Sequence, residues 1–280
     1  MPEIQLNGTP YYYELTGETR PMSLSKCILL HGFSGSSQNW QPLLPSLTSH
    51  FQVLTLDILG HGRSSSPPDI NRYQMANIAN DIIALLDQQT NQPVHLLGYS
   101  MGGRLALCLA VHYPQRFKSL ILESASPGLK TEAEREERRQ RDNALADRIE
   151  RDGIESFVDF WESLSLWASQ EQLSSDTRIR LHQQRLQNNS TGLANSLRGM
   201  GTGVQPSLWE KMTNLTLPTL LMTGELDKKF VGIAQEMALL LPQTSHITIH
   251  NAGHTIHLEK PTQYTQTVVS FLKNIEGNHV

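Results

Sequence analysis

Residues 94–104 read VHLLGYSMGGR, and this stretch says more about the architecture than any other. Its first four residues are typical of a buried strand, and the residues after Arg104 have the apolar spacing of a helix. Between them lies a Gly-x-Ser-x-Gly pattern, in which Gly98 and Gly102 let neighbouring backbone pass close to Ser100. We predict a tight strand-to-helix turn that presents Ser100 at a helix N-terminus, where backbone N–H groups favour developing negative charge. A glycine-rich turn without chemistry is the alternative interpretation.

A serine hydroxyl needs a base and an acid that orients the base, so two further residues are required. Asp227 follows the apolar residues 220–222, and His254 follows the strand-like residues 246–250. Each therefore stands just past the carboxyl end of a strand, at the sheet edge where Ser100 is expected. The order of serine, acid and histidine along the chain predicts a Ser100–Asp227–His254 triad.

Two neighbouring residues compete for these roles. Glu225 lies two residues before Asp227, but the turn that begins at Gly224 places the aspartate further out. His257 lies three residues after His254, and we interpret it as a histidine on a helix surface.

A second glycine-containing turn, LHGFSG at residues 30–35, follows an early strand. Such a turn supplies a backbone N–H to an oxyanion hole, and we expect the N–H groups of Phe33 and Met101 to form one. The stretch ILGHGRS at residues 58–64 closes the next strand in a glycine-rich loop, in which we assign His61 a structural role.

Strand-like and helical segments alternate over most of the chain. The strand-like runs are residues 11–15, 27–30, 53–56, 94–97, 120–122, 219–222 and 247–249. Several are continuously apolar, as strands covered on both faces are. The segments with helical spacing include residues 75–86, 104–112 and 261–272. The pattern predicts an α/β fold with a mostly parallel central sheet and helices on both of its faces.

The alternation stops between residues 128 and 209, where charged helical sequence replaces the strands. We expect this segment, called the lid segment below, to be a helical insertion into a core of residues 1–127 and 210–280. An insertion between two parallel strands lies over their carboxyl ends, where such folds bind ligands. Thr131 followed by Glu134 is the predicted start of its first helix.

Composition narrows the class of ligand. The net charge is −4 with 18% charged residues, which leaves no basic footprint for nucleic acid and favours a small-molecule substrate. The N-terminus has no leader-like pattern and no segment reaches about 18 apolar residues, so we expect a cytoplasmic protein without membrane insertion. Cys27 and Cys108 lie in apolar stretches and predict buried free thiols. We expect no metal, no cofactor and no obligate protein partner.

With these motifs in this order, the chain resembles the α/β-hydrolase superfamily from about residue 8 to its end. Within the superfamily, GYSMGGR at 98–104, SPGL at 126–129, an Arg-rich helix, and an arginine followed by paired asparagines resemble one lyase family. That family is the 2-succinyl-6-hydroxy-2,4-cyclohexadiene-1-carboxylate synthases of menaquinone and phylloquinone biosynthesis. The resemblance implies elimination of pyruvate from a tricarboxylate by the triad. It implies substrate contacts at Tyr99, Arg104, Arg138, Trp161 and Arg185.

The chemistry of arginine fits such a substrate. Arg104 lies four residues after the nucleophile, where a simple esterase has no evident need of a guanidinium, and arginines bind carboxylates through paired hydrogen bonds. Alternatively, the arginines of the lid segment balance its glutamates on a solvated face, as the spacing of Glu134 and Arg138 would allow. We adopt this second interpretation for Arg139 and Arg141.

Two other functions remain compatible with the same residues. A hydrolase of esters or of vinylogous C–C bonds would use the same triad with water as the attacking group. A hydrolase-like binding protein that has lost catalysis would have no need of the complete triad, so the triad counts against it.

Overall fold

The computed structural model describes residues 3–17 and 24–277. The strands of these residues form one sheet in the order β1-β2-β4-β3-β5-β6-β7-β8. Their bounds are β1 Glu3–Leu6, β2 Thr9–Thr16, β3 Lys26–Leu30, β4 Gln52–Leu56, β5 Val94–Tyr99, β6 Phe117–Glu123, β7 Thr219–Gly224 and β8 Thr244–Ile249. The strands from β4 to β8 in this order pair in parallel, whereas β1 pairs antiparallel with β2 and β2 pairs antiparallel with β4. The predicted mostly parallel sheet is confirmed.

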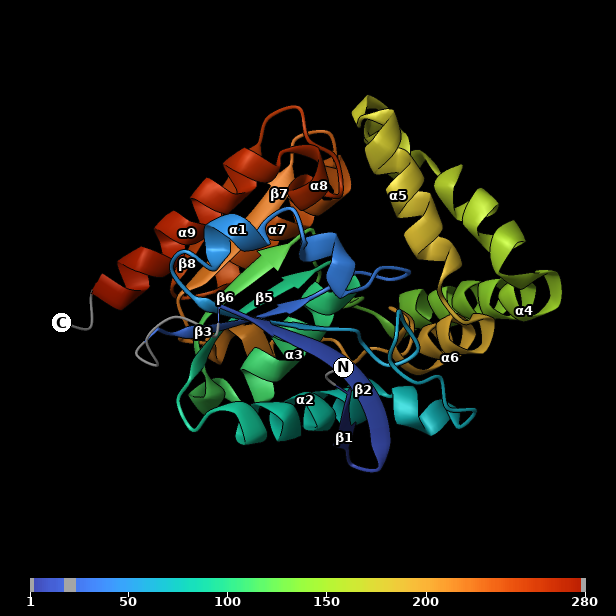
Figure 1. Ribbon diagram of the computed structural model, residues 1–280, viewed down its shortest axis with the longest axis horizontal. Helices are drawn as coiled ribbons and strands as arrows, with labels where there is room; N and C mark the ends of the chain where they lie inside the picture. The colour runs from blue at the N-terminus through green and yellow to red at the C-terminus, as the bar shows by residue number, and fades with distance from the viewer. Residues whose placement is uncertain (1–2, 18–23, 278–280) are drawn as a thin grey trace.

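Helices cover both faces of this sheet (Figure 1). The α-helices are α1 Leu44–Leu47, α2 Met75–Gln89, α3 Met101–His112, α4 Glu132–Glu162, α5 Ser175–Leu186, α6 Ser190–Met200, α7 Lys228–Leu240, α8 Ile256–Glu259 and α9 Pro261–Gly277. The short 3₁₀ helices are η1 Ser37–Trp40, η2 Ile70–Tyr73, η3 Pro114–Arg116, η4 Ser165–Gln172 and η5 Lys211–Asn214. Apolar side chains of α2, α3 and α7 pack in one core cluster, and those of α1 and α9 pack in a second. Because both faces are covered, β4, β5 and β7 are buried along their whole length.

Strand β1 and helix α7 are among the elements that the sequence analysis did not name. Strand β1 adds an antiparallel edge beside β2, and helix α7 begins directly after Asp227. Apolar side chains of α7 and its C-terminal flank pack on the core at Ile233, Ala234, Met237, Ala238 and Leu241. This is the spacing of an amphipathic helix, so the sequence does carry a signal for α7.

The helices α4, η4, α5 and α6 lie between β6 and β7 in the chain and beside the sheet in space (Figure 1). Helices α4 and α6 share a small apolar cluster of their own, which includes Ile149, Phe157 and Leu193. Helix α4 bends at Gly153, whose φ is 82°. The lid segment thus has a cluster of its own, but Phe33 packs against both this cluster and the first cluster of the sheet, to which Met200 of α6 also belongs. Its boundaries at residues 128 and 209 stay a prediction.

The first turn of α4 differs in one respect from the expectation. Thr131 and Glu134 form the predicted capping box, in which Glu134 accepts a hydrogen bond from the Thr131 N–H at 2.8 Å. Glu134 is thereby occupied, and Arg138 instead pairs with Asp142 one turn further on, at 2.7 Å. The pair of Glu134 and Arg138 that their spacing allows does not form, because the N-terminus of the helix binds the Glu134 carboxylate.

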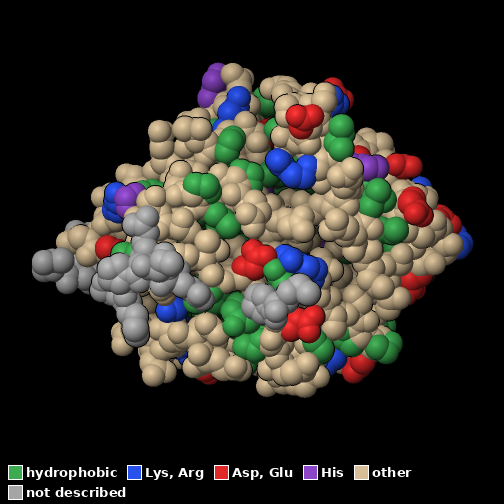
Figure 2. Space-filling model, viewed as in Figure 1, with side chains coloured by type: hydrophobic (Ala, Val, Ile, Leu, Met, Phe, Trp, Pro, Cys, Tyr) green, Lys and Arg blue, Asp and Glu red, His purple; other side chains and the backbone are tan. Residues whose placement is uncertain are grey.

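The surface carries no gathered patch of one charge on the side that Figure 2 shows, where acidic and basic side chains are interspersed. Cys27 and Cys108 are buried free thiols, as expected. Within residues 3–17 and 24–277, no helix is both long and apolar enough to cross a membrane.

Candidate active site

The turn between β5 and α3 holds Ser100 in a conformation that side chains rarely adopt, with φ 50° and ψ −108°. A Cβ at Gly98 would lie 2.3 Å from the Gly102 carbonyl oxygen, and one at Gly102 would lie 2.2 Å from the Leu30 carbonyl oxygen. The predicted need for both glycines is therefore confirmed. The Ser100 N–H donates to the Glu123 carbonyl at 2.8 Å, which anchors the turn to β6.

Three side chains from three strand ends meet at this turn. His254 Nε2 lies 3.0 Å from Ser100 Oγ, and His254 Nδ1 lies 2.6 Å from Asp227 Oδ2. With the proton on Nδ1, the imidazole donates to Asp227 and accepts from the serine hydroxyl, as general-base chemistry requires. The rings of Tyr99, Trp167 and Phe230 surround the buried imidazole.

The competing acid faces away from this site. Glu225 accepts from the Asn251 N–H at 3.1 Å and pairs with His250 at 2.6 Å on the surface. The hydrogen bond from Asn251 is the main cause that lowers the pKa of Glu225. Asp227 is thus the carboxylate that contacts His254.

His257 is fully buried, and its expected place on a helix surface is wrong. Its Nδ1 lies 2.8 and 2.9 Å from the two carboxylate oxygens of Glu123. Glu123, the last residue of β6, is itself fully buried, and its carboxyl group requires such a partner because burial of an unpaired polar group is costly. The pair packs beneath Tyr99, behind the triad.

The expected oxyanion donors lie beside the nucleophile. A Cβ at Gly32, the residue before Phe33, would lie 3.5 Å from Ser100 Cβ, so this loop runs directly against the serine. Met101 is the first residue of α3, where a backbone N–H has no acceptor within the helix. Phe33 and Met101 both line the cavity that contains Ser100.

This cavity has a volume of about 260 Å³ and lies between the core and the lid segment. The sequence-predicted residues among its lining are Ser100, His254, Phe33, Met101, Tyr99, Arg104, Arg138 and Trp161. Asp227 is not among the lining residues and contacts the cavity through His254. The structure thus brings together side chains from β5, α3, α4 and the loop after β8.

The cavity is positively charged at its end near Arg104 and Arg138. Burial, together with the charge of Arg138, lowers the pKa of Arg104 to about 10. Arg104 Nη1 donates to the Met200 carbonyl at 2.9 Å and to Gln205 Oε1 at 2.8 Å, both neutral acceptors. Asp142 pairs with Arg138 and offsets one of the two charges. The remaining positive charge suits an anionic ligand.

Tyr99 lines the cavity on the side of the triad. Its hydroxyl lies 3.0 Å from Thr255 Oγ1, and burial raises the pKa of Tyr99. The phenol therefore stays protonated and is available as a hydrogen-bond donor or acceptor.

Arg185 lies outside the lining of this cavity. Its Nη1 pairs with Glu162 at 2.7 Å and its Nη2 donates to Gln170 at 3.3 Å. Its guanidinium stands 5.5 Å from the ring centre of Trp167, which does line the cavity. The ring of Trp167 thus separates Arg185 from the cavity that the other predicted contacts line.

Sequence reasoning missed several residues of this site, among them Asp142, Trp167 and Lys229. Asp142 stands four residues after Arg138, a spacing that signals an ion pair on a helix. Lys229 stands two residues after Asp227 and could have been placed at the same sheet edge. No comparable signal identifies Trp167, because its position depends on how η4 packs against α8.

Comparisons with known proteins agree with this geometry. The model of the alpha/beta hydrolase fold family matches residues 28–261. A putative 2-succinyl-6-hydroxy-2,4-cyclohexadiene-1-carboxylate synthase of Bacillus subtilis (strain 168) is 45% identical over 255 residues, which cover 91% of this chain and 93% of that protein. The synthase of Salmonella arizonae is 33% identical over 246 residues, with 88% and 93% covered.

A solved structure described as MenH from S. aureus is similar over nearly its whole length. It superimposes with a TM-score of 0.90 at 36% identity, covering 95% of this chain and 98% of that one. The chain belongs to the α/β-hydrolase fold family and, within it, to the family of 2-succinyl-6-hydroxy-2,4-cyclohexadiene-1-carboxylate synthases.

Proposed function

We propose that the chain eliminates pyruvate from 2-succinyl-5-enolpyruvyl-6-hydroxy-3-cyclohexene-1-carboxylate to give 2-succinyl-6-hydroxy-2,4-cyclohexadiene-1-carboxylate. It is then a lyase of menaquinone or phylloquinone biosynthesis, the activity for which its relatives are named. The observation that carries the proposal is the pairing, in one cavity, of a connected Ser100–His254–Asp227 set with the guanidinium groups of Arg104 and Arg138.

The triad supplies the proton transfers of this reaction. Ser100 Oγ takes the ring proton α to the succinyl ketone while its own proton passes to His254 Nε2. The electron pair left on carbon delocalises onto the ketone oxygen, where the N–H groups of Phe33 and Met101 stabilise the enolate. The pair then returns through the ring and expels the enolpyruvyl oxygen in a 1,4-elimination. His254 gives its proton to the leaving group, which departs as pyruvate.

Binding of the substrate falls to the charged end of the cavity. Arg104 and Arg138 bind carboxylates, with Tyr99 and Trp161 as the contacts between these groups and the reacting centre. Arg185, which pairs with Glu162 in the structure, binds a further carboxylate of the substrate by releasing Glu162. The three carboxylates of the substrate make this change of partner favourable. In this proposal residues 128–209 act as a lid that excludes water, and the protein is cytoplasmic, with the polycarboxylate as its ligand.

The experiment is an incubation of the purified protein with the enolpyruvyl substrate, in which pyruvate and succinate are both quantified. The lyase forms pyruvate and leaves the succinyl group in the product. Succinate or another free acid formed without pyruvate would overturn the proposal and assign the triad to hydrolysis of an ester or C–C bond.

A further inference from the structure

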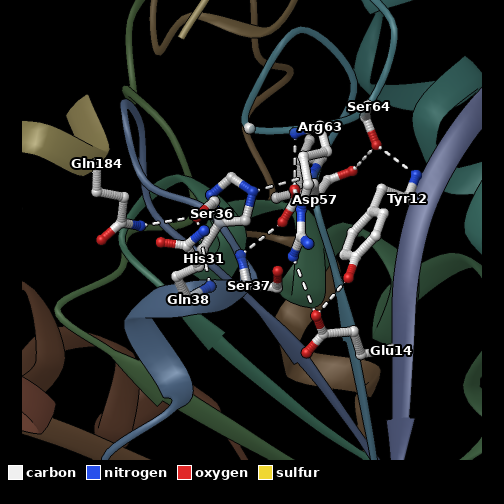
Figure 3. Close-up of polar contacts among 12 residues, drawn as sticks. Tyr12, Glu14, His31, Ser36, Ser37, Gln38, Asp57, Arg63, Ser64 and Gln184 are labelled. Atoms are coloured by element: carbon white, nitrogen blue, oxygen red, sulfur yellow. Dashed lines mark hydrogen bonds and ion pairs between the residues drawn. The ribbon is translucent and has the colours of Figure 1, made fainter. Parts of the chain in front are cut away.

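Two side chains at the C-terminal end of α5 contact the loop of the expected oxyanion hole. They are Gln184, in the last turn of the helix, and Asn188, two residues after its end. Gln184 Nε2 donates to Ser36 Oγ at 2.8 Å (Figure 3). The same nitrogen donates to Asn39 Oδ1 at 2.9 Å. Asn188 Nδ2 donates to the Ser34 carbonyl at 2.9 Å. Both amides are 6% exposed, so they are withdrawn from solvent where they meet the loop. These hydrogen bonds join the lid segment to the core loop after β3, which runs directly against Ser100.

Asn188 also contacts the second glycine-rich loop. Its Oδ1 accepts from the Gly62 N–H at 3.0 Å, so one side chain bridges the loops that follow β3 and β4. The buried Asp57 carboxylate ties the same loops together, accepting from the Ser37 N–H at 2.6 Å and the Arg63 N–H at 2.8 Å (Figure 3). Asp57 belongs to the core, whereas Asn188 belongs to the lid segment.

The loop that Asn188 holds is strained. Phe33 and Ser34 are the two central residues of a turn closed by the Gly35 N–H and the Gly32 carbonyl at 3.1 Å. Ser34 has a φ of 60°, a conformation that favours glycine and costs other residues about 1–2 kcal/mol. Contacts around the turn must hold it in place, and the hydrogen bond from Asn188 is made to the strained residue itself.

Gln184 supports the other end of the loop. Ser36 and Asn39 form the capping box of η1, in which the Ser36 N–H donates to Asn39 Oδ1 at 2.9 Å. Gln184 binds both polar groups of this cap. Gln184 and Asn188, at the end of α5, thereby hold both the turn that contains Phe33 and the helix η1 that follows it.

We propose that Gln184 and Asn188 are positioning residues that complete the oxyanion hole when the lid segment is docked. Neither side chain is among the residues that line the cavity of Ser100, and both act on the loop of Phe33 through their hydrogen bonds to Ser34, Ser36 and Asn39. An oxyanion donor works only within a few tenths of an ångström of its place, and removal of one such donor costs about 10²–10³ in kcat. The inference rests on the oxyanion role given to Phe33 in the proposed function.

The test compares Asn188→Ala and Gln184→Ala with a matched control, Asn195→Ala. Asn195 is also a buried asparagine of the lid segment, and its Nδ2 donates to core carbonyls of Pro67 and Pro68 at 3.3 Å, which do not line the cavity of Ser100. For each variant we would measure the melting temperature, kcat and KM for pyruvate release, and kcat for hydrolysis of a neutral p-nitrophenyl ester. The rate at which a fluorophosphonate labels Ser100 gives a further readout of the hole.

We expect Asn188→Ala to lower kcat about 10- to 100-fold in both reactions, with KM for the tricarboxylate within about threefold of wild type. Labelling of Ser100 slows by a similar factor, and Gln184→Ala shows the same pattern. Asn195→Ala loses stability alone. A kcat of Asn188→Ala within threefold of wild type, or an equal loss in Asn195→Ala, would overturn the inference. Slower labelling and ester hydrolysis in a protein that releases no pyruvate would instead contradict the proposed function and leave the inference standing.

Discussion

Asp227 and Glu225 stand two residues apart, and the difference between their surroundings decides which one serves the triad. Asp227 contacts His254 Nδ1 at 2.6 Å and also caps α7 by accepting from the Phe230 N–H at 3.4 Å. Glu225 is occupied by Asn251 and His250 outside the site. Only Asp227 can therefore hold the imidazole in the tautomer that accepts a proton from Ser100.

Asp227→Asn should lower kcat for pyruvate release by about 10⁴-fold, because an amide no longer stabilises the imidazolium and favours the wrong tautomer. Glu225→Gln should leave kcat within about threefold, since it removes only an exposed ion pair. Steady-state kinetics of both purified variants, with circular dichroism to confirm folding, check this. Equal losses in the two variants would leave the acid of the triad unidentified.

At the scale of the elements, the strand ends explain how much of the site the sequence predicts. Ser100 follows β5 directly, whereas Asp227 and His254 lie three and five residues past the ends of β7 and β8, and the parallel sheet brings these strand ends to one edge. Their meeting follows from topology alone. The place of Arg185 does not, because it depends on how α5 and η4 pack, and the structure pairs it with Glu162 outside the cavity.

The same reasoning accounts for His257. Its position three residues after His254 indicates an exposed helix face, but the helix that contains it is a single turn folded back against β6. The sequence alone does not indicate that His257 pairs with Glu123, which is buried at the end of β6. The sequence predicted the positions of side chains that depend on the order of the strands. It did not predict the positions that depend on how short helices pack.

Two elements carry the arginines that face the cavity, α3 with Arg104 and α4 with Arg138. Arg104→Ala and Arg138→Ala should each lower kcat/KM for the tricarboxylate by about one to two orders of magnitude, since each removes a charge-assisted contact of about 1.5–3 kcal/mol. Hydrolysis of a neutral p-nitrophenyl ester should change by less than about threefold. Arg141→Ala is the control, because Arg141 is exposed and paired with Glu137. An ester rate that falls as far as the elimination rate would show that the arginines support the fold rather than the substrate.

At the scale of the whole molecule, buried histidines link stability to pH. Burial lowers the pKa of His31 to about 4 and that of His61 to about 3, below the ordinary value of 6.5, and the two rings lie 5.3 Å apart. The unfolded chain therefore binds protons at these residues that the folded chain does not. Their contribution is fully present above about pH 6.5 and is lost as pH falls toward 4, by about 1.4 kcal/mol per pH unit for each histidine.

Urea unfolding between pH 7 and pH 5 measures this loss. The free energy of unfolding should fall with decreasing pH, and His61→Gln should reduce the slope below pH 6 by about 1.4 kcal/mol per pH unit. The variant's lower stability at pH 7 does not affect the comparison, since only the slopes are compared. Identical slopes in wild type and His61→Gln would contradict neutral burial of His61.

The molecule as a whole joins a triad on one sheet edge to a charged cavity beneath a helical segment, and the proposed elimination requires Ser100 to act there as a base. The most direct measurement is the rate of pyruvate release from the enolpyruvyl tricarboxylate by wild type and by Ser100→Ala. The wild type should release pyruvate, and Ser100→Ala should be slower by about 10⁴-fold or more while remaining folded. No pyruvate release by the wild type, or more than a tenth of its kcat in Ser100→Ala, would contradict a lyase that works through this serine.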